Sequence, residues 1–79
     1  LDTKALILYK QKEYRQARTL LEQLHAAQPH DATIALHLAK TVQKLGDAQR
    51  AKIIAQRATP HAHSAYEKTR IAKFLGSNS

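Results

Sequence analysis

The side chains in this sequence that could hold a metal ion are its five histidines. His61 and His63 lie two residues apart beside Pro60. The other three are scattered along the chain: His25, His30 and His37. A zinc site needs three or four converging ligands, and neither a thiolate nor a carboxylate stands at a regular spacing from these histidines. The sequence therefore predicts no metal site, and it places His61 and His63 in a solvated loop.

No set of residues in the sequence is typical of catalysis. Cysteine is absent, which excludes a thiol nucleophile and a disulfide framework. Ser64 stands three residues before Glu67, and this spacing is that of a capping box at a helix start rather than of a nucleophile and its base. Asp31 and Asp47 likewise precede helical segments. The two glycines are 30 residues apart and form no phosphate-binding loop. We expect no enzymatic activity and no cofactor.

The charge of the chain is strongly positive. Thirteen Lys and Arg against six Asp and Glu leave a formal net charge of +7, which suits an acidic partner, nucleic acid or an anionic surface. The basic residues are spread along the whole chain, so a solvated outer face is the simplest interpretation. No apolar run approaches the roughly 20 residues that a membrane-spanning helix needs. Nothing in the sequence indicates a compartment.

The clearest helical pattern covers Tyr14–Ala27. Its apolar residues recur at steps of three and four, which places them on one stripe: Tyr14, Ala17, Leu20, Leu21 and Leu24. Pro29 cannot continue a helix and disfavours helical geometry at Gln28.

Four further segments are predicted to be helical, and no segment shows a strand pattern. Residues with high helix propensity favour a helix over Leu1–Lys10, and Asp31 and Asp47 are expected to cap the helices that begin at Ala32 and Ala48. Gly46 fits the position just past a helix end, where a positive φ is needed. The four segments are Leu1–Lys10, Ala32–Lys44, Ala48–Ala58 and Ala65–Leu75. The expected apolar residues of the last are Tyr66, Ile71, Phe74 and Leu75, and residues 76–79 are predicted to be a disordered tail.

Small residues repeat along the chain with a period of 34. Ala5 and Ala39 are separated by this distance, and so are Ala17 and Ala51. Such a period indicates an array of helical pairs. We therefore predict an all-α fold, an α-solenoid of two helix–turn–helix repeats plus a closing helix, five helices in total. The expected division is one domain over 1–75, with repeats at 1–29 and 32–60 and a closing helix at 64–75.

These residues resemble the tetratricopeptide repeat, a family of 34-residue helix–turn–helix units. Both units carry the small residues at the helix crossing, an alanine pair in each. The turn Leu45-Gly46-Asp47 is similar to the glycine–acid turn of the family, and Pro29 stands at its terminal proline. Four positions depart from the pattern. They are Leu1 at a tryptophan position, Lys4 at a leucine position, Lys12 at a glycine position and Pro60, which comes earlier than the usual proline.

The resemblance implies a binding module for a protein or peptide partner. In this family the first helix of each unit lines a concave groove. The residues expected to face the groove are Leu6, Tyr9, Lys10, Thr33, Leu36, His37, Lys40, Gln43 and Lys44. Leucines, a tyrosine and lysines together suit a peptide with apolar and acidic groups. The asparagine and lysine clamp of some family members is not expected, because its asparagine places hold Leu6 and His37, and Asn78 is the one asparagine.

Two alternatives to groove binding stay open. The apolar run Ala5–Tyr9 could be an interface through which the chain forms a homodimer or docks as a structural appendage, since an exposed apolar patch marks interaction sites. Two repeats are fewer than the three or so needed for independent stability, so the chain is expected to be part of a longer protein or an assembly. Nucleic-acid binding by the basic residues is disfavoured, because the chain has no recognition-helix motif and no pair of exposed aromatic residues for base stacking.

Overall fold

The computed structural model describes residues 3–77, and within this range it is all α-helical with one short 3₁₀ turn. The elements are α1 (Thr3–Lys10), α2 (Tyr14–Ala27), α3 (Ala32–Lys44), α4 (Ala48–Ala58), η1 (Thr59–His61) and α5 (Ala65–Ser77). The prediction of five helices without strands is thus confirmed for the described range. Leu1 and Asn78, to which the sequence assigned a family position and a tail, lie outside the described residues.

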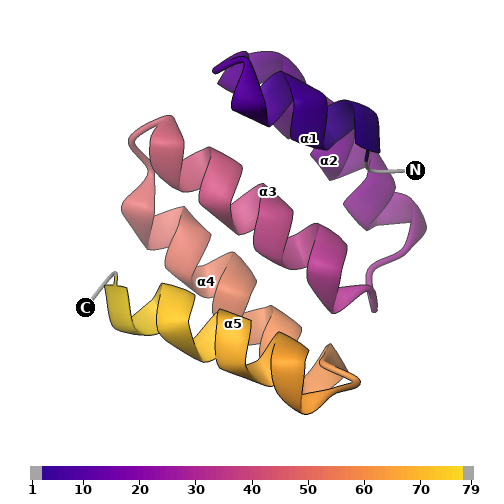
Figure 1. Ribbon diagram of the computed structural model, residues 1–79, viewed down its shortest axis with the longest axis vertical. Helices are drawn as coiled ribbons and strands as arrows, with labels where there is room; N and C mark the ends of the chain where they lie inside the picture. The colour runs from indigo at the N-terminus through magenta and orange to yellow at the C-terminus, as the bar shows by residue number, and fades with distance from the viewer. Residues whose placement is uncertain (1–2, 78–79) are drawn as a thin grey trace.

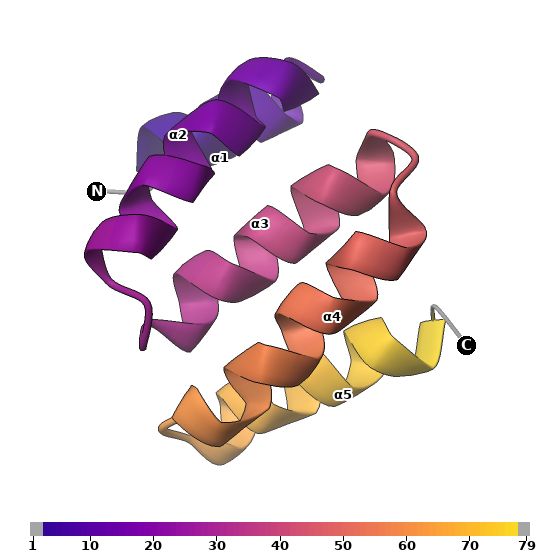
Figure 2. The ribbon, with the colours of Figure 1, turned by 180° about the vertical axis from the view of Figure 1, so that it is seen from behind.

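The helices form two layers. Figure 1 shows α1, α3 and α5 in front, and the reverse view in Figure 2 brings α2 and α4 forward. α3 lies at the centre and contributes the largest share of the core. Its buried residues are Ala32, Ile34, Ala35, Leu36, Leu38, Ala39, Thr41 and Val42. Because α3 contacts helices on three sides, it is apolar around most of its circumference.

Alanines stand where the helices cross. Ala17, Ala39, Ala51 and Ala55 are each 0% exposed. A methyl side chain at these positions lets two helix backbones approach closely, and the larger side chains of the core fill the space between the crossings. The 34-residue period of alanines therefore records the repeated crossing of one helix pair on the next.

The predicted helix starts are confirmed at α3 and α4. The Asp31 carboxylate accepts the backbone N–H of Ile34 at 3.1 Å, and the Asp47 carboxylate accepts that of Arg50 at 3.1 Å. Each aspartate thus satisfies one of the backbone donors that a helix leaves unpaired in its first turn. Gly46 has a φ of +96°, as its place after α3 predicts.

The turn between α1 and α2 places Lys12 in the left-handed region, with a φ of +65°. This region costs an L-residue with a side chain about 1 kcal/mol relative to glycine. We therefore expect Lys12→Gly to raise the free energy of unfolding by about 0.5–1 kcal/mol in urea titrations. Gly46→Ala is the matched opposite case, and it should be destabilising by a similar amount although nothing lies within 4 Å of the added methyl. A neutral result at both positions would contradict the left-handed conformations.

α5 differs from its prediction at its end and on its surface. The helix continues through Gly76 to Ser77, two residues past the expected end, and residues 78–79 of the predicted tail lie outside the described range. Ile71 and Phe74 are buried as expected, whereas Tyr66 is 69% exposed and is not part of the apolar face. Its ring instead lies beside Arg70, whose guanidinium carbon is 5.5 Å from the ring centroid.

The start of α5 forms a modified capping box. The Ser64 hydroxyl accepts the backbone N–H of Glu67 at 3.2 Å, as predicted. The Glu67 carboxylate accepts the backbone N–H of His63 at 2.8 Å and, with its other oxygen, the Thr33 hydroxyl at 2.7 Å. The Thr33 hydrogen bond and then the His63 N–H hold the pKa of Glu67 below its usual value. One carboxylate thus both caps α5 and ties it to α3.

Candidate binding groove

A small depression lies between α1, α3 and α5, on the layer that carries the predicted groove. It measures about 210 Å³. Five of the nine predicted groove residues line it: Leu6, Tyr9, Lys10, His37 and Lys40. The structure adds Ala5, Leu21 and Thr41 at its base and Arg70 from α5 at its edge.

Helical spacing explains why these side chains meet. Leu6, Tyr9 and Lys10 are separated by three and four residues, so they share one face of α1. His37, Lys40 and Thr41 have the same spacing on α3 and face the same side. α2 packs against both α1 and α3. The two faces therefore border one depression (Figure 1).

Lys40 is the chemically distinctive residue of this depression. It is half-buried, and it makes no ion pair or hydrogen bond with any residue in the range 3–77. Loss of hydration lowers the pKa of its ammonium group, and the nearby Arg70 guanidinium lowers it further. Two cations therefore border a mainly apolar surface, and none of the described residues that line this depression is acidic. An anionic group of a ligand would relieve both the lost hydration and the mutual repulsion.

Tyr9 forms the aromatic wall of the depression. Its ring meets that of Tyr14 edge to face, with centroids 5.3 Å apart and an interplanar angle of 69°. Burial, and secondarily Tyr14, raise the pKa of the Tyr9 hydroxyl. The hydroxyl therefore stays neutral at physiological pH and can serve as a hydrogen-bond donor to a ligand.

Comparison with family models supplies the identity of the repeat. A model described as tetratricopeptide repeat matches residues 8–71. The chain belongs to the tetratricopeptide repeat family. Comparisons with curated proteins and with solved structures found no significant match. Tetratricopeptide repeats generally mediate protein–protein interactions, which is the function that the sequence predicts at this level.

α5 lies in the same layer as α1 and α3, the first helices of the two repeats (Figure 1). Glu67 stands 34 residues after Thr33, and the two side chains are hydrogen-bonded. Arg70 was not predicted as a groove residue, and the 34-residue period does not place it there, because the position one period earlier is Leu36, which lies outside the depression.

The remaining predicted groove residues lie elsewhere. Leu36 is only 4% exposed and Thr33 is bonded to Glu67, so α5 covers both. These two residues face a neighbouring depression that α5 borders. Gln43 and Lys44 lie one to two turns further along α3, outside the 210 Å³ depression.

The histidines are brought partly together. His30 lies in the loop after α2 and His61 at the end of η1, and their closest ring nitrogens are 3.2 Å apart. His61 is thus half-buried against His30, whereas His63 is exposed as predicted for a solvated loop. Among residues 3–77 no three His, Asp or Glu side chains converge as a metal site would need. Within the same range, no helix has the length and apolar character required to cross a bilayer.

Proposed function

We propose that this tetratricopeptide repeat binds a peptide segment of a partner protein in the depression between α1, α3 and α5. The observation that carries the proposal is Lys40, a half-buried cation beside Arg70 at the edge of an apolar surface, which has no ion-pair partner among residues 3–77. An apolar side chain of the peptide would rest on Leu6 and Tyr9. An acidic group next to it would lie against Lys40 and Arg70.

The size of the depression favours a peptide over a small cofactor. Ligand pockets for small molecules usually measure about 300–1,000 Å³. At about 210 Å³ the depression holds one or two side chains, and the backbone of a bound segment would extend along the groove. Charge at its edge then selects for acidic sequences and speeds their association.

The proposal is tested by selecting a library of random dodecapeptides on the immobilised chain. We expect enrichment of sequences with an apolar residue next to Asp or Glu. Lys40→Glu should weaken the selected peptides at least about tenfold in fluorescence anisotropy, because it replaces a contacting cation by a repelling anion. Lys52→Glu is the control, since it makes the same charge change on α4 in the other layer. Equal binding to the chain and to Lys40→Glu would exclude the groove as the site.

Self-association through α1 is the second candidate, and a specific observation favours it. Ile7 is 49% exposed and Leu6 is 37% exposed, so α1 presents apolar surface next to the groove. Light scattering at low and high salt distinguishes the candidates. A dimer that survives high salt would assign this surface to an interface, and a monomer would leave the groove as the site.

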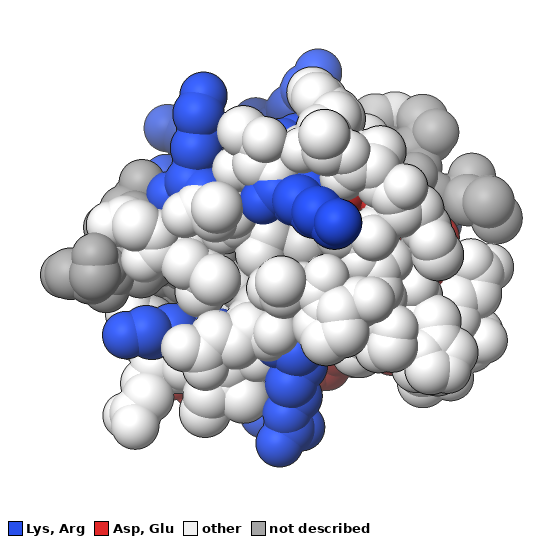
Figure 3. Space-filling model, turned by 90° about the horizontal axis from the view of Figure 1, so that it is seen from below, with Lys and Arg blue, Asp and Glu red and all other residues white. Residues whose placement is uncertain are grey.

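Nucleic acid is a weaker candidate. Figure 3 shows Lys and Arg side chains projecting from the face seen from below, with almost no acidic surface between them. These side chains are separated by uncharged surface rather than joined in a continuous strip. Among the Phe and Tyr residues of the range 3–77 only Tyr66 is exposed, so a pair of aromatic rings for base stacking is lacking there.

A further inference from the structure

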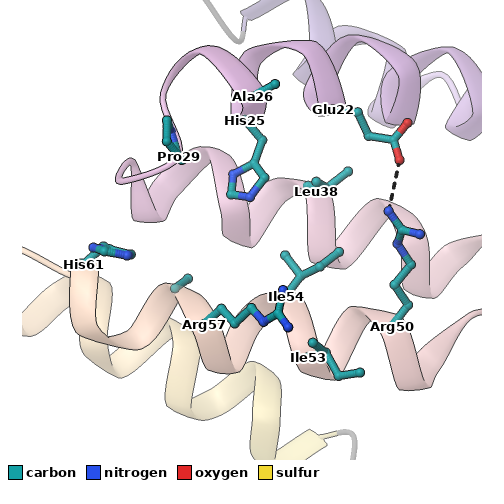
Figure 4. Close-up of a pocket in the computed structure, with 11 residues that line it drawn as sticks. Glu22, His25, Ala26, Pro29, Leu38, Arg50, Ile53, Ile54, Arg57 and His61 are labelled. Atoms are coloured by element: carbon teal, nitrogen blue, oxygen red, sulfur yellow. Dashed lines mark hydrogen bonds and ion pairs between the residues drawn. The ribbon is translucent and has the colours of Figure 1, made fainter.

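The layer opposite the groove contains a trough between α2 and α4. Figure 2 shows α3 between these two helices, and Figure 4 shows the residues that line the trough. The trough measures about 490 Å³. Leu38 reaches its floor from α3, and Ile54 and Ala58 line it from α4. Its base is therefore apolar, and it shares no lining residue with the groove.

Both ends of the trough are bridged by side chains. At one end the Arg50 guanidinium is 3.4 Å from the Glu22 carboxylate, drawn as the dashed line in Figure 4. At the other end His30 contacts His61 with ring nitrogens 3.2 Å apart. These contacts join α2 to the first turn of α4, and the loop after α2 to η1. The trough is thus a formed concavity rather than a gap between independent helices.

The trough carries one arginine without an ion-pair partner among residues 3–77, and exposed apolar surface. Arg57 lines it, is exposed, and makes no ion pair or hydrogen bond with any residue in the range 3–77. Glu22 is its one acidic lining residue and is already paired with Arg50. Ile53, which also lines the trough, is 43% exposed. The His25 ring points from α2 toward α4, and its buried Nδ1 finds no hydrogen-bond partner among the described residues.

We infer that the trough is a second docking site, for an acidic peptide segment that carries one apolar side chain. The apolar side chain rests on Ile53 and Ile54, and a carboxylate of the segment pairs with Arg57. Charge complementarity selects this occupant, because the free charge in the trough is positive and its floor is apolar. The inference goes beyond the proposed function, since it concerns the other layer and does not depend on the groove being occupied.

The test is a titration followed by ¹H–¹⁵N NMR on the labelled chain. The probe is the N-acetylated, C-amidated tripeptide Asp-Leu-Glu, and the comparison peptide is Lys-Leu-Lys. We expect saturable shifts of the amides of Ile53, Ile54 and Arg57 with the acidic probe, with a dissociation constant of about 1 mM, as few contacts offset the cost of association. The basic peptide should leave these amides unchanged.

Variants locate the site. Arg57→Glu should weaken the probe at least about tenfold, and Arg57→Gln should weaken it less, because one charge is removed but none is reversed. Lys52→Glu, on the same helix but outside the trough, is the charge-matched control and should weaken it at most about twofold. Arg57 is exposed, and an unchanged pattern of the remaining amides confirms that each variant is folded. Equal weakening by Arg57→Glu and Lys52→Glu, shifts confined to the groove residues Leu6 and Lys40, or no saturable shift at all would each overturn the inference.

Discussion

Leu21→Ala should lower the free energy of unfolding by about 2–5 kcal/mol. Leu21 is 1% exposed and lies among the largest fully buried side chains of the described range. It packs under the groove, where α2 supports both α1 and α3. Truncation of its isobutyl side chain to a methyl leaves a cavity in the packed core between the helices. A domain of this size has little more stability than this change removes, so partial unfolding at 25 °C is expected.

Urea titration followed by circular dichroism at 222 nm measures the change. Ile7→Ala is the matched control, because it removes a similar volume from a helix position that is 49% exposed. This control should stay within about 0.5 kcal/mol of the parent chain, as surface substitutions do. If both variants lose the same stability, Leu21 is not the support of the groove that its burial indicates.

Most of the fold could be predicted because its signals are local. The predicted bounds of α2, α3 and α4 coincide with those of the structure. Each of these helices has an apolar stripe in its own sequence, and α3 and α4 have an aspartate whose side chain caps them. The alanine period adds the one piece of long-range information, that the helix pairs repeat.

The end of α5 shows where local rules fail. A glycine after an apolar stripe predicts a helix end, and at Gly46 this prediction is correct because the chain must turn there with a positive φ. Gly76 lies inside α5 and does not have a positive φ. The same residue type thus ends one helix and continues another, and its local sequence does not tell the two cases apart.

The groove was predictable only in part, because a groove is also defined by what covers it. The positions predicted on α1 and α3 were those that the resemblance to the tetratricopeptide repeat implies off the apolar stripe, and five of them line the depression. To predict that α5 covers Thr33 and Leu36, one would have to know which surface of α3 this helix contacts. Three contacts join residues that are about 30 positions apart in the sequence, and no local sequence pattern predicts such pairs. They are Thr33–Glu67, Glu22–Arg50 and His30–His61.

The second large effect is expected at the crossing of the repeats. Ala51→Leu should cost about 1–3 kcal/mol, because Ala51 is 0% exposed and a leucine side chain has no space between two closely packed backbones. Its period partner Ala17, also 0% exposed, should respond to Ala17→Leu in the same way. Similar losses at both positions would follow from a repeated crossing, whereas a structure without repetition gives no reason for the two to agree.

Ala48→Leu is the control for this crossing. Ala48 is exposed at the start of α4, and leucine is nearly as good a helix former as alanine. It should therefore be close to neutral in the same urea titration. The comparison separates volume from helix propensity, since both substitutions place the same side chain on the same helix. A neutral Ala51→Leu would mean that the helices do not cross at Ala51, and the two-layer arrangement that forms both the groove and the trough would then have to be revised.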